Sequence, residues 1–419
     1  MAILSLIQIF AAEFCGIILF FLGILFSYKD YALFIAIMTT CAILKRILFH
    51  QLHVRYSFIW TTGMLMIIGF MYVFITPLFY DFEPGVLYSG NFLSFIGQVI
   101  PSVLFFILIS DDEKIQDNIK TLVPYIAILM TIVAFLCTIS PNNNTRALVY
   151  DDTGFNYQNL SYMAAYAGGL SEYFIITSKT HKYNGIFNRK IGIILGYFMI
   201  ATNFCTILLT GGRGGLVLLV ITTFFSFWFF NRHNEELNIK IIHSTFLYLI
   251  ILLISLFCLW YVNTLELETS GVKRIIGFLS GDGDSGRGLL RNKAIDAFIS
   301  SPVIGHGFGS VFWELGEYSH NILTDILVEL GIVGFLLFFY ILRRFFKAIR
   351  IIIRNNVTEV FWLYIFMFGI TKYMFSGYYL SSLALWISIF FSFNRLDYIQ
   401  VKSDTIKSKK HFNNIKSLN

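Results

Sequence analysis

The segment IIGFMYVFITPLFY, residues Ile67–Tyr80, contains no charged side chain, and neither does IILLISLFCLWYV, residues Ile250–Val262. Similar segments recur along most of the 419-residue chain, of which 57% is hydrophobic and only 13% is charged. A soluble domain has roughly 25% charged residues. A helix that crosses a membrane needs about 20 mostly apolar residues, and many runs approach that length. The sequence therefore predicts an all-α integral membrane protein.

Hydropathy predicts a single membrane domain, residues 1–394, with both termini in the cytoplasm. Cytoplasmic connections of membrane proteins are enriched in Lys and Arg, and in this topology most of the 31 basic residues face the cytoplasm. Residues 395–419 form a basic cytoplasmic tail, which we expect to be a disordered topology anchor. The twelve predicted spans are 3–26, 31–49, 57–79, 91–110, 121–140, 157–178, 190–209, 214–230, 243–262, 321–342, 358–375 and 378–394.

The connection between spans 9 and 10, residues 263–319, is much longer than the others and is predicted to lie outside. Long loops are uncommon without a function of their own. Within it, DSGRGLLRNKAIDAFISSP (residues 284–302) predicts a short amphipathic helix, with Asp284 or Ser285 as N-cap and Pro302 as the stop. We expect it to lie against the bundle or the lipid interface. Its apolar face holds Leu290, Ala294 and Phe298, and another face holds Arg287 and Arg291.

Neither cysteines nor acidic loops indicate a metal site. All five cysteines fall inside predicted spans, which supports neither a disulfide framework nor a cysteine metal site. The motif DGDSG, residues 282–286, departs from the calcium-loop pattern because Lys293 occupies the twelfth position, where that loop needs a glutamate. A D-x-D metal site for nucleotide sugars is disfavoured because those sugars are cytosolic. We therefore expect no metal and no cofactor.

Three predicted helices begin on the outer side with residues suited to an anion. Arg213 lies in LLTGGRGGLVLL, Arg287 is in the first turn of the loop helix, and His320 and Asn321 open the tenth span in YSHNILTDILVELG. Helix N-termini attract anions through free N–H groups and a partial positive charge. Arginine adds bidentate recognition of phosphate oxygens. The outer face is therefore predicted to bind a phosphate or pyrophosphate group.

Each of these positions also has a purely structural interpretation. Arg213 fits an interfacial arginine that reaches water, and GGRGG fits a tight turn between two closely packed spans. Arg287 and Arg291 fit contacts with anionic lipid headgroups. Asn321 fits a helix cap beside an interfacial His320. The functional interpretation is favoured because all of these residues are predicted to lie on one face.

Acidic residues inside spans are costly and usually face a partner or an aqueous cavity. Asp325 and Glu329 continue one helical stripe from Asn321. Lys372 is their candidate partner, and a structural ion pair and a polar substrate cavity are equally favoured. Two further acids, Glu13 and Glu172, are interpreted as lone packing or hydrogen-bonding groups.

The C-terminal half, from Leu208 to Leu342, resembles the bacterial O-antigen polymerase and O-antigen ligase superfamily. The resemblance rests on the Gly-rich arginine that opens a span, on GRGLLRNKAIDAFISSPVIGHGFGS in the long loop, and on SHNILTDILVELGIVG. It implies an integral-membrane glycosyltransferase that acts on undecaprenyl-pyrophosphate-linked sugars. By this resemblance Arg213 and Arg287 bind the pyrophosphate and His320 is the active-site histidine. Arg291 stands where the family often has an aromatic residue, so it is either a second phosphate contact or the family arginine itself.

The predicted reaction breaks the bond between an anomeric carbon and a pyrophosphate oxygen. Arg213 and Arg287 would stabilise the leaving group without a metal, and His320 would act as general base or as a pyrophosphate ligand. Arg291, Asn321 and Asp325 are the predicted substrate-binding residues. Direct displacement would invert the anomeric configuration.

The expected activity is polymerisation of lipid-linked repeat units into O-antigen or capsular polysaccharide, at the outer face of the cytoplasmic (inner) membrane. The alternatives are an O-antigen ligase, which transfers polymer to lipid A-core, and a flippase or other transporter. A transporter would carry its charges along a central cavity at the bilayer midplane. The family implies a chain-length regulator and a flippase as partners beside the lipid-linked substrates and membrane lipid, and nothing indicates nucleic acid.

Overall fold

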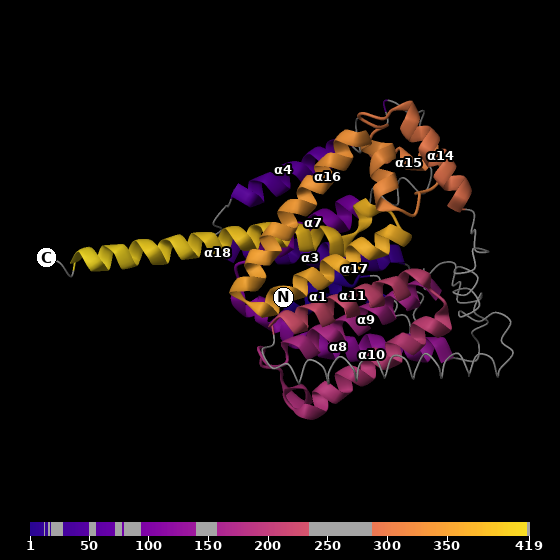
Figure 1. Ribbon diagram of the computed structural model, residues 1–419. Coiled ribbons are helices and arrows are strands. Elements are labelled where there is room, and N and C mark those ends of the chain that lie inside the picture. Colours follow the sequence, from indigo (N-terminus) through magenta and orange to yellow (C-terminus); the bar gives the residue numbers. More distant parts are fainter. Residues whose placement is uncertain are drawn as a thin grey trace.

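The computed structural model (Figure 1) confirms the all-α class, because every regular element among the residues it describes is a helix. Three of these helices are long and apolar enough to cross a membrane, namely Glu113–Thr138, Lys190–Thr210 and Ile322–Asn355, and shorter apolar helices cover Ile59–Phe70, Phe95–Leu108 and Arg213–Phe229. The twelve-span count therefore stays a prediction. The described residues are 1–11, 13–15, 17, 28–49, 56–71, 78, 94–139, 157–233 and 287–416.

Helices overlap all of the predicted spans but one. The exception is 243–262, which lies outside the described residues, and the spans 3–26, 57–79, 91–110 and 121–140 are described only in part. The α-helices are α1 (Ala2–Ile9), α3 (Tyr28–Phe49), α4 (Tyr56–Phe70), α7 (Ile100–Leu108), α8 (Glu113–Ile139), α9 (Tyr157–Thr177), α10 (Lys190–Thr210), α11 (Arg213–His233), α14 (Arg287–Ser300), α15 (Val311–Glu314), α16 (Ile322–Asn355), α17 (Phe361–Phe375) and α18 (Leu383–Lys416). A π-helical stretch, η2 (Phe95–Val99), leads into α7, and short 3-10 helices are η3 (Gly185–Asn188), η4 (Val357–Val360) and η5 (Tyr379–Ser381).

Helix α9 packs against α8, α10, α11 and α17 and is buried along nearly its whole length. Its small residues let the neighbours approach closely, as is common between membrane helices. Gly168 faces the side chain of Leu219 in α11, and Gly169 faces Phe368 in α17. The buried carboxylate of Glu172 accepts hydrogen bonds from Thr223 and Ser226 of α11. The interpretation of Glu172 as a hydrogen-bonding group is thereby confirmed.

The helices alternate in direction and gather their connections at two ends. At one end, Lys120 of α8 contacts Glu359 of η4, and Arg395 of α18 reaches the carbonyl of Ser110. We call this the basic end. At the other, Ser161 of α9 donates to the carbonyl of Gly212, which precedes α11. We call this the loop end. The connections grouped at the basic end are ones that the predicted topology places on the inner side, and those grouped at the loop end are ones that it places on the outer side.

The predicted tenth span is not one uninterrupted helix. Gly331 has a φ of 60°, which breaks α16 within its first third. The glycine-rich segment before α15 fills the break with its own backbone: the N–H groups of Ile332 and Val333 donate to Pro302 and Val303 at 2.9 and 3.1 Å. In return, the N–H groups of His306 and Gly307 donate to the carbonyls of Val328 and Glu329 at 3.0 and 2.7 Å. The backbone groups that the break would leave unpaired are thus satisfied, as burial requires.

A side chain at Gly331 should destabilise this junction. An added Cβ would overlap the carbonyl of Val303, and the positive φ would be strained as well. Gly316 is a matched control, because its φ is 86° and an added Cβ would meet nothing within 4 Å. We expect Gly331→Ala to cost about 1–3 kcal/mol more than Gly316→Ala, the usual cost of overpacking. Thermal unfolding of the two purified variants measures the difference, and equal midpoints would contradict the packing of this segment.

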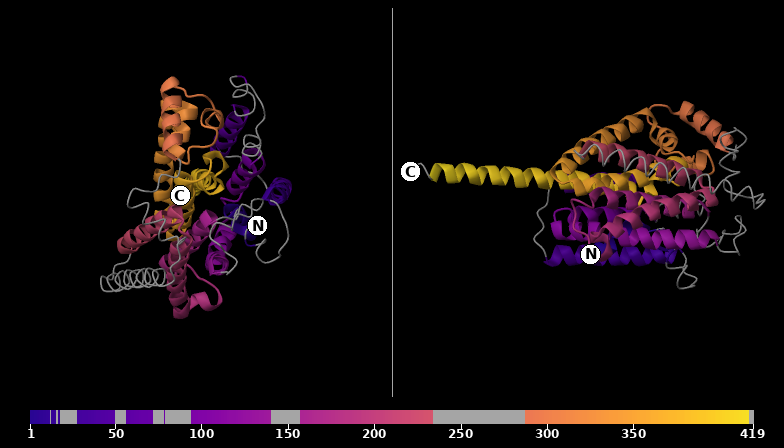
Figure 2. Two further views of the ribbon diagram at one scale, coloured as in Figure 1. Left: turned by 90° about the vertical axis from the view of Figure 1, so that its right-hand side faces the viewer. Right: turned by 60° about the horizontal axis from the view of Figure 1, so that its bottom comes forward.

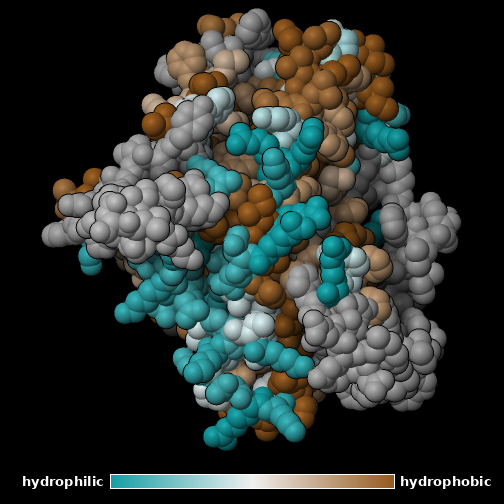
Figure 3. Space-filling view, turned by 60° about the vertical axis from the view of Figure 1, so that its left-hand side comes forward, coloured by the Kyte–Doolittle hydropathy of each residue, from teal (hydrophilic) through white to brown (hydrophobic). Residues whose placement is uncertain are grey.

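The predicted disordered tail is wrong, because α18 continues to Lys416 and extends away from the bundle at the basic end (Figures 1 and 2). No Pro or Gly interrupts residues 383–416, and helix-favouring residues continue past the apolar part. Arg395, the first residue of the predicted tail, is buried in the bundle and pairs with Glu359 at 3.2 Å. Figure 3, which brings this end forward, shows hydrophilic side chains gathered across it.

Candidate functional site at the loop end

Figure 1 places α14 and α15 at the end of the bundle opposite the C-terminus. This loop end also holds the starts of α11 and α16 and the end of α17, as the contacts below establish. It therefore holds the helix starts that carry Arg213 and His320, together with the loop helix α14. The twelve-span order alone could not show which of these starts are neighbours.

Arg213 is the first residue of α11, and the chain reaches it through a tight turn. Helix α10 ends at Gly211, whose φ is 70°, and Ser161 Oγ donates to the Gly212 carbonyl at 2.9 Å. An added Cβ at Gly214 would overlap the hydroxyl of Tyr162. The tight-turn interpretation of GGRGG is thus confirmed. The half-buried Arg213 adds a cation to the positive end of a helix with no acid in its first turn, which favours a bound anion.

Tyr162 links the start of α11 to the end of α17. Its hydroxyl donates to the carbonyl of Lys372 at 3.4 Å. The ammonium of Lys372 lies 5.7 Å from the ring centre of Tyr162 and 5.8 Å from that of Tyr166, within cation–π range. The same ammonium pairs with Glu13 at 3.3 Å. Lys372 is therefore the partner of Glu13 and not of the acids of α16, and the interpretation of Glu13 as a lone acid is wrong.

His320 is the one described residue other than glycine with a positive φ, at 62°. Its neighbours hold that conformation from both sides. The N–H of Ser319 donates to Asp325 Oδ1 at 2.8 Å, and Ser319 Oγ donates to the carbonyl of Asn321 at 3.0 Å. Asn321 caps α16, since its Oδ1 accepts from the N–H groups of Leu323 and Thr324. Strained backbone that the surroundings enforce is concentrated at functional sites.

Tyr318 brings this turn to the end of α17. Its ring contacts the imidazole of His320, with ring centres 4.5 Å apart, and the backbone of Gly377 lies beside its hydroxyl. Burial, followed by the charge of Glu317, raises the pKa of Tyr318, so the phenol stays neutral near pH 7. Gly377 lies just beyond Lys372, and Lys372 contacts Tyr162 beside the start of α11. A continuous set of contacts thus connects the helix start that carries Arg213 with the turn that carries His320.

The two acids of α16 have separate surroundings. Asp325 is fully buried and fixes the turn at Ser319. Glu329 accepts from the hydroxyls of Tyr378 and Tyr379, both at 2.7 Å, and from the N–H of Gly309 at 2.9 Å. Neither acid pairs with Lys372, the partner predicted from the sequence, because Lys372 pairs with Glu13. The sequence did not predict that Tyr378 and Tyr379 donate to Glu329, because the two tyrosines lie about 50 residues further along the chain and share no periodic pattern with α16.

The predicted loop helix is confirmed and is α14. Its side chains are described at Arg291 but not at Arg287. Arg287 is the first residue of α14, and its side chain lies outside the described atoms. Arg291 is exposed. Ala294 and Ala297 are buried, and His306 Nε2 lies 2.9 Å from the carbonyl of Ala297, which ties α14 to the segment that fills the break in α16. Which arginine matches the family arginine stays open. Asp284, Ser285 and the DGDSG motif lie outside the described residues.

Nothing in the described part of the chain groups three His, Cys, Asp or Glu side chains as metal ligands. The chemical features of the loop end are cations, helix starts, the buried acids Asp325 and Glu329, and one constrained histidine, whose Nε2 lies 3.9 Å from a carboxylate oxygen of Glu317. Such an arrangement suits an anionic ligand at the surface of a bundle.

The chain is thus a helical protein whose apolar helices suit a membrane and whose loop end suits an anion. Residues 198–339 match the family model of the O-antigen ligases. This match confirms the resemblance of this part of the chain to the O-antigen ligase and polymerase superfamily. No curated protein and no solved structure matches the chain.

Proposed function

We propose that the protein is a membrane glycosyltransferase that polymerises undecaprenyl-pyrophosphate-linked repeat units into O-antigen or capsular polysaccharide. The observation that carries the proposal is the extent of the family match. Residues 198–339 contain every residue predicted to form the site, from Arg213 to Asp325. The proposed location is the cytoplasmic membrane with the loop end outward, so that a lipid-linked pyrophosphate meets these residues at the outer headgroup level.

In the proposed reaction, a hydroxyl of the acceptor sugar attacks the anomeric carbon of the donor sugar. The bond from that carbon to the pyrophosphate oxygen breaks, the configuration inverts, and the leaving lipid pyrophosphate gains negative charge. Arg213, Arg287 and the starts of α11 and α14 stabilise this charge without a metal. Fixed cations act strongly in such a site because they need not reorganise during the reaction.

His320 accepts the proton of the attacking hydroxyl in this scheme. A general base is effective only when it is held within hydrogen-bond reach of its proton. The turn of Ser319, Asn321 and Asp325 supplies that constraint, because its hydrogen bonds fix the backbone of His320. Asp325 and Asn321 thus support the reaction by positioning His320, and direct contacts of Arg291, Asn321 or Asp325 with the sugars stay predictions.

The ligase is the second candidate, because the matched family is described as O-antigen ligase. It would use the same donor and the same cations, and it would differ in the acceptor, lipid A-core. The transporter alternative has less support. The break in α16 is a feature found in transporters, but here the backbone of Pro302–Gly307 fills it.

Removal of the gene should separate the candidates. If the protein is the polymerase, the mutant should lose the ladder of polymer lengths and retain single repeat units, on the lipid carrier or capped onto the acceptor lipid. If it is the ligase, long chains should accumulate on the lipid carrier and be absent from lipid A-core. Gel separation of the extracted polysaccharide measures this. A normal ladder would refute both.

A further inference from the structure

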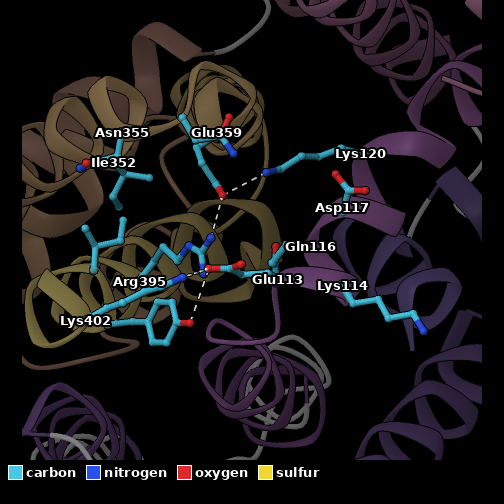
Figure 4. A pocket seen from close by; sticks show the side chains of 13 residues that line it. Glu113, Lys114, Gln116, Asp117, Lys120, Ile352, Asn355, Glu359, Arg395 and Lys402 are labelled. Atoms are coloured by element: carbon cyan, nitrogen blue, oxygen red, sulfur yellow. Dashed lines mark hydrogen bonds and ion pairs between the residues drawn. The ribbon is translucent and has the colours of Figure 1, made fainter. Parts of the chain in front are cut away.

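A polar cleft of about 590 Å³ opens at the basic end, among the start of α8, the end of α16 and the middle of α18. Figure 4 shows Glu359, Arg395 and Lys402 arranged around it, with Lys114 directed away. Its volume lies within the roughly 300–1,000 Å³ of small-molecule sites. The proposed reaction does not use this cleft, because the predicted site residues lie at the other end of the bundle.

The buried part of the cleft carries an unbalanced positive charge. Glu359 pairs with Lys120 at 3.0 Å and with Arg395 at 3.2 Å, and all three side chains are less than one-tenth exposed. Within this buried set two cations share one carboxylate, and the carboxylate of Glu113 attracts Arg395 from outside it. The nearby carboxylate of Glu113 is 57% exposed and is held by Lys402 at 2.8 Å. Uncompensated buried charge is costly, so an anion in the cleft would stabilise this arrangement.

Three buried polar atoms of the cleft lack a hydrogen-bond partner among the described residues. They are Arg395 Nε, Glu359 Oε2 and Gln116 Oε1, which belong to residues that line the cleft but are themselves enclosed, so these side chains must turn for a ligand to reach them. Buried polar atoms in proteins normally have a partner. The arginine N–H needs an acceptor, and the two oxygens need donors. A complementary ligand therefore carries an anionic acceptor together with hydrogen-bond donors.

We propose that the cleft binds a phosphate ester that carries hydroxyl groups, of the glycerophosphate class. The phosphate oxygens accept from Arg395 Nε and from the ammonium of Lys402, and the negative charge balances the buried cations. The hydroxyls donate to Glu359 Oε2 and Gln116 Oε1. The carboxylate of Asp117 also lines the cleft, but it is 70% exposed and lies 3.4 Å from His181 Nδ1. Soluble glycerol 3-phosphate and the headgroup of phosphatidylglycerol share this chemistry.

Asn356→Asp tests the site with little disturbance of the fold. Asn356 lines the cleft and caps η4, since its Oδ1 accepts from the N–H of Thr358 at 3.0 Å. Aspartate caps equally well, but it adds a negative charge to the wall of the cleft. Asn188→Asp is the matched control. Asn188 is exposed in η3, at the same end of the bundle and outside the residues that line the cleft.

The full chain would be placed in phosphatidylcholine nanodiscs. Binding of glycerol 3-phosphate would be measured by titration calorimetry, and phosphatidylglycerol would be tested by the shift in unfolding temperature when it is included in the nanodisc. We expect one probe to bind the native chain and Asn188→Asp alike, and Asn356→Asp to bind it at least about tenfold more weakly through charge repulsion.

The probe that binds identifies the source, as a soluble metabolite or a membrane lipid. Failure of both probes, or equal binding by Asn356→Asp, would overturn the proposal. Equal binding of inorganic sulfate would refute the role of the hydroxyl contacts. These measurements do not involve polymer synthesis. Their outcome is therefore independent of whether the proposed glycosyltransferase activity is correct.

Discussion

Replacement of Arg213 by alanine should lower the rate of polymer formation by about 10²–10³-fold, which is the effect of removing one preorganised group that stabilises developing charge. Arg213 begins α11 at the loop end, where its positive charge adds to the free N–H groups of a helix start. The alanine variant would keep the helix start and lose the cation. The measurement is the yield of polymer from purified lipid-linked repeat units, with the amount of inserted protein determined in parallel.

Two further variants distinguish charge from structure. Arg213→Lys keeps the charge and loses the bidentate geometry, so it should retain more activity than the alanine variant. Arg232→Ala removes an exposed arginine near the opposite end of the same helix, where the guanidinium lies 5.6 Å from the ring centre of Trp228. It should retain full activity. Full activity in Arg213→Ala would remove this residue from the proposed mechanism.

Local patterns predicted the helices and their starts because those features depend on nearby residues. The glycines around Arg213 indicated a turn, and the helix α14 follows from its spacing of apolar residues. Asn321 could be identified as a cap because capping is a contact over two or three residues. The family motifs also lie within short segments. They can therefore be recognised in the sequence without knowledge of the tertiary contacts at the loop end.

The long-range pairs could not be predicted in the same way. Lys372 pairs with Glu13 from the other end of the chain, and no periodicity connects them. The break at Gly331 was missed because ILTDILVELGIVG has the pattern of an uninterrupted apolar helix, and a single glycine is tolerated in one. The hydrogen bonds that permit the break come from Pro302 and Val303, in a different segment. The continuation of α18 past Arg395, by contrast, agrees with the local sequence, because residues 383–416 contain no Pro or Gly.

Loss of the imidazole of His320 should lower the rate by about 10²–10⁴-fold, the contribution typical of a general base. Three variants separate the imidazole from the backbone that holds it. His320→Asn and His320→Gly both tolerate the positive φ of 62°, whereas His320→Ala adds strain. If the imidazole provides the catalysis, all three should be inactive while the Asn and Gly variants unfold at the native temperature. Native activity in His320→Asn would exclude a general base at this position.

The pH profile of the native enzyme then distinguishes the two roles of this histidine. A general base must be neutral to accept a proton, so the rate should fall as the pH drops through the titration of the imidazole. A cationic imidazole that binds pyrophosphate would give the opposite dependence, with the rate falling as the pH rises. We expect the first profile, and we expect added imidazole to restore part of the activity of His320→Gly, whose missing side chain leaves space beside Tyr318. The opposite profile would reassign His320 to the pyrophosphate, and the proton would then need another acceptor within reach of the acceptor sugar.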